Sequence, residues 1–178
     1  MSLPHALLTS LTERPCSGMD LAHRFDRSIG YFWPATHQQI YRELGRLEEA
    51  GWVASAPAET GRGRKRIYQV LPAGREELRR WMLEPEEPRA LRDEMMVRLR
   101  AEAAIGPTGL EGEVRRRLGL HQAMLAHYRE IEARDFTGKA GTRERQLQYL
   151  VLTSGILAET AQIEVLTKAL AILEGPED

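Results

Sequence analysis

The amino-acid sequence predicts a mainly α-helical protein with one β-hairpin. Apolar residues recur at helical spacing along most of its 178 residues, and two short β-prone runs, at 52–56 and 66–71, interrupt that pattern. Apolar residues make up 42% of the chain and charged residues 29%, which is ordinary for a globular protein. This composition argues against a disordered, collagen-like or membrane-spanning chain.

The first two helices are expected over residues 3–11 and 18–28. In the first, leucines recur every fourth residue and form one apolar stripe. This helix must end before Pro15, because the residue that precedes a proline resists the α-helical conformation. We expect residues 16–18 to form a turn that connects the two helices.

The third helix has the clearest start signal in the sequence. Thr36 and Gln39 fit a capping box, in which each side chain bonds the other residue's backbone amide. Gly51 follows the last residue of the helical pattern, as is common just beyond a helix end. The spacing turns three apolar side chains inward: Ile40, Leu44 and Leu47.

The two β-prone runs are expected to pair as a hairpin, followed by a helix over residues 73–83. Glycines make the hairpin tip flexible, and the tip carries four positive charges within five residues. Taken alone, such a basic cluster is more often a solvated loop than a phosphate-binding site. The cluster consists of Arg62, Gly63, Arg64, Lys65 and Arg66.

The C-terminal half is predicted to be helical, over residues 91–105, 111–134 and 144–173. The last helix carries apolar residues on two faces, so it needs more than one packing partner. A Pro- and Glu-rich stretch precedes this half and is typical of a linker. The predicted organisation is therefore a first domain over residues 1–83, a linker over 84–90 and a helical domain over 91–178.

Charge is unevenly divided between the two halves. The whole chain has a formal net charge of −1, but residues 1–83 carry 12 basic and 9 acidic side chains, and residues 84–178 carry 13 and 17. A modestly positive first half is compatible with a phosphate-bearing partner. No apolar run is long enough to span a membrane, and the N-terminal residues lack an export signal, so we expect a cytoplasmic protein.

The order helix, helix, capped helix, basic hairpin, helix is that of a winged helix-turn-helix, here followed by a helical domain. In that fold the capped helix presents polar side chains to base edges in the major groove of double-stranded DNA. The hairpin, or wing, supplies cations for neighbouring phosphates. We therefore predict a sequence-specific DNA-binding transcriptional regulator. Its candidate DNA contacts are Thr36, His37, Gln38, Gln39, Tyr41, Arg42, Arg46, Arg62, Gly63, Arg64, Lys65 and Arg66.

The same stretches resemble the PadR family of bacterial transcription regulators. Residues 6–21, 39–51 and 61–75 carry the resemblance, which is strong over 3–83 and looser after 90; its most specific parts are residues 41–51 and the wing. The segment that starts at Arg92 resembles the larger subgroup, which has a helical dimerisation domain. Arg42 departs from the family, which often has proline there. The resemblance implies a homodimer that binds a pseudo-palindromic operator, usually represses, and in many members is released by a small aromatic molecule.

Two further residue sets follow from these expectations. The surplus apolar surface of the last helix suits a dimer interface. Candidate dimerisation residues are Leu3, Leu7, Leu147, Leu150, Val151, Leu157, Ala161 and Val165. A pocket for a small-molecule effector between the two halves is a weaker hypothesis, because its candidate residues, Trp33, His121, Met124 and Tyr128, are more often core side chains.

The alternatives to a DNA-binding regulator have less support. The sequence lacks the usual phosphate-binding glycine loop, a nucleophile elbow and a metal-binding motif, so we expect neither an enzyme nor a cofactor. Cys16, the single cysteine, fits a tight turn better than a redox sensor. The main competing hypothesis is a helical interaction module whose winged helix binds a protein partner instead of DNA.

Overall fold

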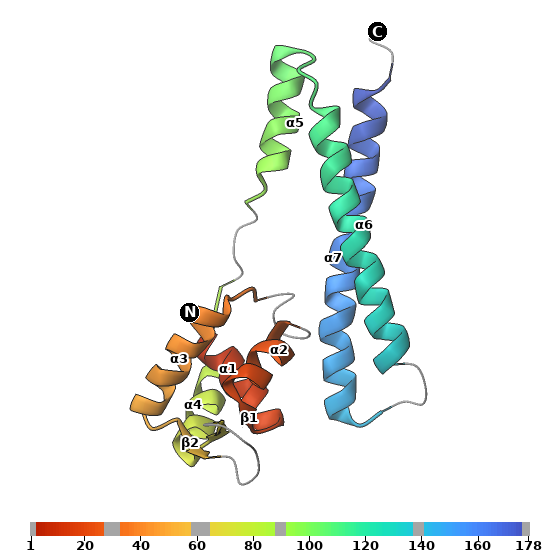
Figure 1. The fold of residues 1–178 in the computed structure, drawn as a ribbon. Helices are drawn as coiled ribbons and strands as arrows, with labels where there is room; N and C mark the ends of the chain where they lie inside the picture. Colours follow the sequence, from red (N-terminus) through yellow and green to blue (C-terminus); the bar gives the residue numbers. More distant parts are fainter. Residues whose placement is uncertain (1–2, 27–32, 58–64, 88–91, 137–140, 176–178) are drawn as a thin grey trace. The chain divides into compact units, whose positions relative to one another are not determined.

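A computed structural model describes residues 3–26, 33–57, 65–87, 92–136 and 141–175 of the chain. The chain forms two compact units, Met1–Pro88 and Arg89–Asp178 (Figure 1). Each unit has its own buried core. Within the described part of the chain, no helix combines the length and the apolarity that a membrane crossing requires.

In its described residues, the first unit combines four helices with a small antiparallel sheet. The sheet has the order β1-β3-β2, so β3 lies in the middle. The elements in chain order are α1 (Leu3–Glu13), β1 (Cys16–Ser17), α2 (Gly18–Asp26), α3 (His37–Glu49), β2 (Val53–Pro57), β3 (Arg66–Val70) and α4 (Pro72–Met82). This is the winged helix-turn-helix that the sequence predicts.

The short strand β1 corrects the sequence prediction, which placed a turn at residues 16–18. Cys16 lies opposite Tyr68 and Ser17 opposite Ile67, so β1 adds an edge strand to the hairpin. Two residues are too few for an alternating pattern, and for that reason the strand cannot be recognised from its own sequence. Its pairing brings the start of α2 next to the root of the wing.

The core of the first unit is built by the inward faces of its helices. Ile40, Leu44 and Leu47 of α3 are fully buried, as their spacing predicts. They pack with leucines of α1, with Phe25 of α2 and with Val53 of β2. Burial of this kind contributes about 1.5–3 kcal/mol per large apolar side chain.

Leu7 requires a second correction. We expected it at a dimer interface, but its side chain is 0% exposed within the core of its own unit. A side chain with no accessible surface cannot contact another copy of the chain, so Leu7 is a core residue. Leu3, at the start of the same helix, is half-buried and packs against that core.

The second unit consists of α5 (Glu94–Ile105), α6 (Glu111–Asp135) and α7 (Arg143–Leu173). The two long helices α6 and α7 run side by side over most of their length (Figure 1). The start of α5 joins them through a small core of Met95, Val114, Leu166 and Ala169. Only one of the two apolar stripes predicted for α7 contributes to this packing, and the other is exposed.

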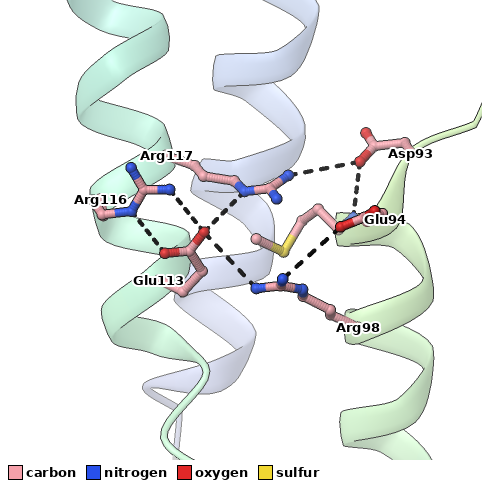
Figure 2. A network of polar contacts seen from close by, with 7 residues as sticks. Asp93, Glu94, Arg98, Glu113, Arg116 and Arg117 are labelled. Carbon is pink, nitrogen blue, oxygen red and sulfur yellow. Dashed lines mark hydrogen bonds and ion pairs between the residues drawn. The ribbon is translucent and has the colours of Figure 1, made fainter.

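A network of charged side chains ties α5 to α6 around that core. Figure 2 shows Glu113 between three arginines, Arg98 of α5 and Arg116 and Arg117 of α6. Arg117 also approaches Asp93, whose carboxylate caps α5 by accepting from the Met95 amide at 2.9 Å. The hydrogen bonds from Arg116 and Arg117 lower the pKa of Glu113 to about 2, so its charge persists at neutral pH.

Candidate nucleic-acid interface

The capping box at the start of α3 holds the end of the helix that the sequence predicts to contact DNA. The Gln39 amide donates to Thr36 Oγ1 at 3.2 Å, and the Thr36 amide donates to Gln39 Oε1 at 2.8 Å. Two of our candidate contacts are therefore occupied within the helix end itself. Their structural role is to orient the first turn of α3, where the next side chains project outward.

The outward face of α3 carries the remaining candidates on that helix, and all of them are exposed: His37, Gln38, Tyr41, Arg42 and Arg46. Arg46 forms an ion pair with Glu43 at 3.2 Å, one turn away. Arg42, by contrast, makes no ion pair with any residue that the structure describes. Its guanidinium can therefore meet a ligand without breaking an ion pair to any of these described residues.

Gly18 of α2 sets how closely α2 and α3 approach each other, a role that the sequence analysis missed. A Cβ atom on this glycine would lie 2.5 Å from Cε1 of Tyr41. The Tyr41 ring therefore covers the start of α2 and joins the two helices of the helix-turn-helix. At the other end of α2, the His23 and His37 rings lie 5.9 Å apart.

The wing candidates divide into those that the structure describes and those outside it. Arg62, Gly63 and Arg64 lie outside the described residues. Lys65 forms an ion pair with Asp20 at 2.9 Å, and its side chain is half exposed. Arg66 donates to the Ser55 carbonyl at 3.1 Å and approaches Glu48 at 3.4 Å.

Glu48 joins the end of α3 to the wing, a contact between elements that helical periodicity does not reveal. Its carboxylate accepts from the Ser55 amide at 3.0 Å and from the Ser55 hydroxyl at 2.5 Å. These hydrogen bonds lower the pKa of Glu48 and keep it charged. Arg66 completes this cluster through its Nη2 atom, which helps to hold β2 and β3 against α3.

Most candidate dimerisation residues form an exposed apolar stripe on α7. Leu150 and Leu157 expose 61% and 64% of their surfaces, and the stripe also includes Leu147, Val151, Ala161 and Val165. Ile156, Leu166 and Ala169 of the same helix are buried. Exposed apolar surface of this extent on one helix is typical of a protein–protein contact.

The four candidate effector residues belong to different units, one to the first and three to the second. Trp33 belongs to the first unit, where it packs against the core. Tyr128 of α6 is buried, and its ring packs closely on Gly155 of α7, where a Cβ atom would lie 3.0 Å from Cε2 of the ring. His121 Nδ1 lies 2.6 Å from Glu159, so it already has a partner, and the Met124 side chain is exposed.

Cys16 lies in β1, where burial raises the pKa of its thiol above the ordinary value. The nearby Arg24 opposes this rise but has the smaller effect. A buried thiol with a raised pKa is poorly reactive, because the thiolate is the nucleophile. This agrees with a packing role for Cys16.

Comparison with known protein families identifies both units. The model described as the transcriptional regulator PadR-like family matches residues 7–80. The model described as virulence activator alpha C-term matches residues 91–174. The two families thus cover the winged helix-turn-helix and the helical unit in turn.

Similar proteins and solved structures agree with this assignment. A protein of Mycobacterium tuberculosis named probable transcriptional regulator Rv1176c is 41% identical over 98% of both chains. The structure of the Vibrio cholerae virulence activator AphA is 34% identical over 97% of this chain and 98% of its own, with a TM-score of 0.81.

Bacillus subtilis PadR shares the fold at lower identity. Its structure with operator DNA is 24% identical over 98% of this chain and 100% of its own, with a TM-score of 0.83. The same protein has been solved with p-coumaric acid. These relatives are regulators and not enzymes, as the sequence analysis expected. The chain belongs to the PadR-like family of transcriptional regulators.

Proposed function

We propose that the protein is a homodimeric, DNA-binding repressor that reads its operator with the outward face of α3. The observation that carries this proposal is an anchored helix start followed, on the outward face of the same helix, by an arginine that pairs with no acidic residue among those described. The capping box fixes the first turn, and Arg42 has no ion-pair partner among the described residues. That a PadR protein of the same fold was solved with operator DNA supports the proposal.

Gln38 and Arg42 have the chemistry that base recognition needs. An arginine can bond the two acceptors of guanine in the major groove, and a glutamine can bond the donor and the acceptor of adenine. Both side chains are exposed on α3, four residues apart, so they share one face of the helix. Tyr41 and His37 lie beside them and are placed to contact phosphates through their polar groups.

The dimer is proposed from the exposed stripe of α7. Pairing two copies through this stripe would bury apolar side chains that water otherwise surrounds, which stabilises association. A two-fold symmetric protein presents two α3 helices and calls for an operator with two-fold symmetry. Half-sites are then expected about 34–36 Å apart, or one turn of DNA. A protein that acts on chromosomal DNA must also be cytoplasmic.

The proposal includes release of the DNA when a small aromatic molecule binds the protein. Bacillus subtilis PadR was solved with p-coumaric acid. Titration of the protein–DNA complex with a panel of phenolic acids would test it, with release of labelled DNA as the signal. If no member of the panel releases DNA, this part of the proposal fails.

The DNA proposal is tested by binding the full chain to the DNA upstream of its own gene, in a mobility-shift assay. We expect Arg42→Ala to weaken binding by about 1–3 kcal/mol, which is roughly five- to 150-fold in Kd. Arg79→Ala is the matched control, because Arg79 is an exposed arginine on α4 that pairs with Glu76.

The salt dependence of binding separates this proposal from its main competitor. Phosphate contacts make the affinity fall steeply with increasing salt. If Arg42→Ala and the wild type bound the DNA with equal affinity, the assignment of α3 to the DNA-binding surface would be contradicted. Absence of salt-dependent binding to any duplex would favour a protein partner for the winged helix. Repression itself is tested with a reporter gene behind the bound promoter, whose expression should rise when the regulator is deleted.

A further inference from the structure

The ion pair between Lys65 and Asp20 places a carboxylate beside a wing cation that we had assigned to DNA. Lys65 Nζ lies 2.9 Å from Asp20 Oδ2, and both side chains are about half exposed. Lys65 lies one residue before β3, and Asp20 is in the first turn of α2. The pair therefore joins the root of the wing to the start of the helix-turn-helix.

Asp20 is held in place before any partner arrives. The Ser17 hydroxyl donates to Asp20 Oδ2 at 2.7 Å, and the Asp20 amide donates to Ser17 Oγ at 3.2 Å. These reciprocal bonds cap α2. The pairing of β1 with β3 sets Ser17 opposite Ile67, two residues from Lys65. The carboxylate is thus fixed by the fold at the position where it meets the lysine.

The carboxylate keeps its charge at neutral pH. The hydrogen bond from Lys65 and then that from Ser17 lower the pKa of Asp20 below its ordinary value. Asp20 therefore contributes a full negative charge to the surface from which the wing starts. A DNA phosphate that approached Lys65 would meet this charge within about 8–10 Å, where repulsion is not yet screened.

The second described cation of the wing is held in a comparable way. Arg66 is engaged by Glu48 and by the Ser55 carbonyl. Both described cations at the wing root thus have acidic partners, whereas Arg42 on α3 has none among the described residues. Sequence-independent attraction depends on cations that are free to replace counterions on phosphates.

We propose that Asp20 is a specificity-determining residue, which keeps Lys65 from phosphates and so limits binding to non-operator DNA. The inference rests on the proposed DNA-binding function and refines it. Discrimination between operator and other DNA is a ratio of two affinities, and lowering the sequence-independent affinity raises that ratio. The fixed carboxylate performs this task while the outward face of α3 supplies the sequence-dependent contacts.

The test measures the affinity of the full chain for a random-sequence duplex across a series of salt concentrations, by fluorescence anisotropy. Asp20→Asn removes the charge but leaves an amide oxygen that can accept from Ser17. We expect this variant to bind the random duplex several-fold more tightly. We also expect its slope of log affinity against log salt to steepen by about 0.9, the value for one added phosphate contact.

Two further variants assign the effect to Lys65. Lys65→Gln in the wild-type background should leave the slope unchanged, and in the Asp20→Asn background it should restore the wild-type slope. Glu76→Gln is the matched control, because it changes the net charge equally but releases Arg79 of α4 instead. Since Lys65→Gln leaves the α2 cap intact, it still tests the inference if Asp20→Asn fails to fold.

The outcomes separate this inference from the function on which it rests. A wild type that binds with a salt-dependent affinity, together with an unchanged slope in Asp20→Asn, would overturn the inference alone. The inference would also be overturned if the single variant Lys65→Gln had a slope shallower than that of the wild type by about 0.9, because Lys65 would then already contact a phosphate in the wild type. If Glu76→Gln also bound the random duplex more tightly, the change in net charge alone would account for the effect, and the inference would be overturned. No salt-dependent binding by any variant would overturn both proposals.

Discussion

Glu77 of α4 is the carboxylate that joins α4 to α1. Its Oε1 lies 3.1 Å from Nε2 of His5, a buried residue of α1 whose ring stacks on Trp81 at 4.4 Å. Arg80 donates two further hydrogen bonds of 2.8 Å to the same carboxylate. The bonds from Arg80, and then that from His5, lower the pKa of Glu77 to about 2. A single residue thus couples the first and last helices of the first unit.

The lowered pKa of Glu77 predicts a defined loss of stability in acid. In the unfolded chain Glu77 titrates near 4.5, so its stabilising contribution is fully present above that pH. It is lost as the pH falls toward about 2, where the folded carboxyl takes up its proton. We expect the wild type to lose more stability than Glu77→Gln between these two pH values, as measured by urea midpoints.

Glu76→Gln is the control for this comparison, because Glu76 is the exposed neighbour on the same helix and pairs with Arg79. The pKa of Glu113 is also lowered to about 2, so Glu113 titrates over the same range and only the difference between variants reports on Glu77. Parallel curves for the wild type and Glu77→Gln would contradict the assignment.

Among the elements, those with strong periodic patterns and end signals follow from the sequence. The third helix combines a capping box, three inward apolar residues and a terminal glycine, and the structure has all three, with Gly51 at a φ of 70°. The two-residue strand β1 is too short for any such pattern, and its partner β3 is distant in the chain. Its existence depends on tertiary pairing.

The features of the candidate site likewise divide into those that the sequence pattern predicts and those that depend on tertiary contacts. The sequence identifies α3 as the element with outward polar residues, since helical periodicity assigns each position to a face. Contacts between elements are not encoded in that periodicity. For this reason the Lys65–Asp20 and Arg66–Glu48 pairs and the packing of Tyr41 on Gly18 required the structure.

Two glycines of the first unit predict opposite effects when replaced by alanine. A Cβ atom on Gly74 of α4 would clash with the Trp52 carbonyl oxygen, a backbone atom that cannot swing away. Gly74→Ala should therefore destabilise the protein by about 1–3 kcal/mol. Gly45 lies on the exposed face of α3 with nothing near its Cβ position, so Gly45→Ala should stabilise by about 0.5–1 kcal/mol.

Urea denaturation of both variants measures this contrast. Each substitution adds one methyl group to a helix, so each serves as the control for the other. Equal shifts of the two midpoints would show that helix propensity alone determines the result and that α4 tolerates a side chain against the sheet.

At the scale of the whole molecule, the two apolar faces of α7 differ in their surroundings. One face packs within the second unit through Ile156 and Leu166, and the other leaves Leu150 and Leu157 in contact with water. Burial of this apolar stripe between two copies of the chain would stabilise a dimer. The proposed operator, with its two-fold symmetry, requires such a dimer. Oligomeric state and DNA binding are therefore coupled expectations for this protein.

Two glutamates introduced into the exposed apolar stripe of α7 should dissociate the proposed dimer. We expect Leu150→Glu combined with Leu157→Glu to shift the sedimentation coefficient from that of a dimer toward that of a monomer. Both side chains are mostly exposed, so the helical content should persist in circular dichroism. Leu83→Glu is the control, because Leu83 lies outside α7 and is still more exposed, at 85% of its surface. A double variant that remains dimeric would place the interface elsewhere.

The arrangement of α3 also bears on how such a regulator can acquire a new target. The residues that fold the helix, namely the Thr36–Gln39 cap and the buried Ile40, Leu44 and Leu47, are distinct from Gln38 and Arg42. Mutations at the latter two positions leave the cap and the core untouched. Randomising them in a selection for altered operators should therefore yield mostly folded proteins. Diversification of promoter recognition can proceed on this scaffold at little cost in stability.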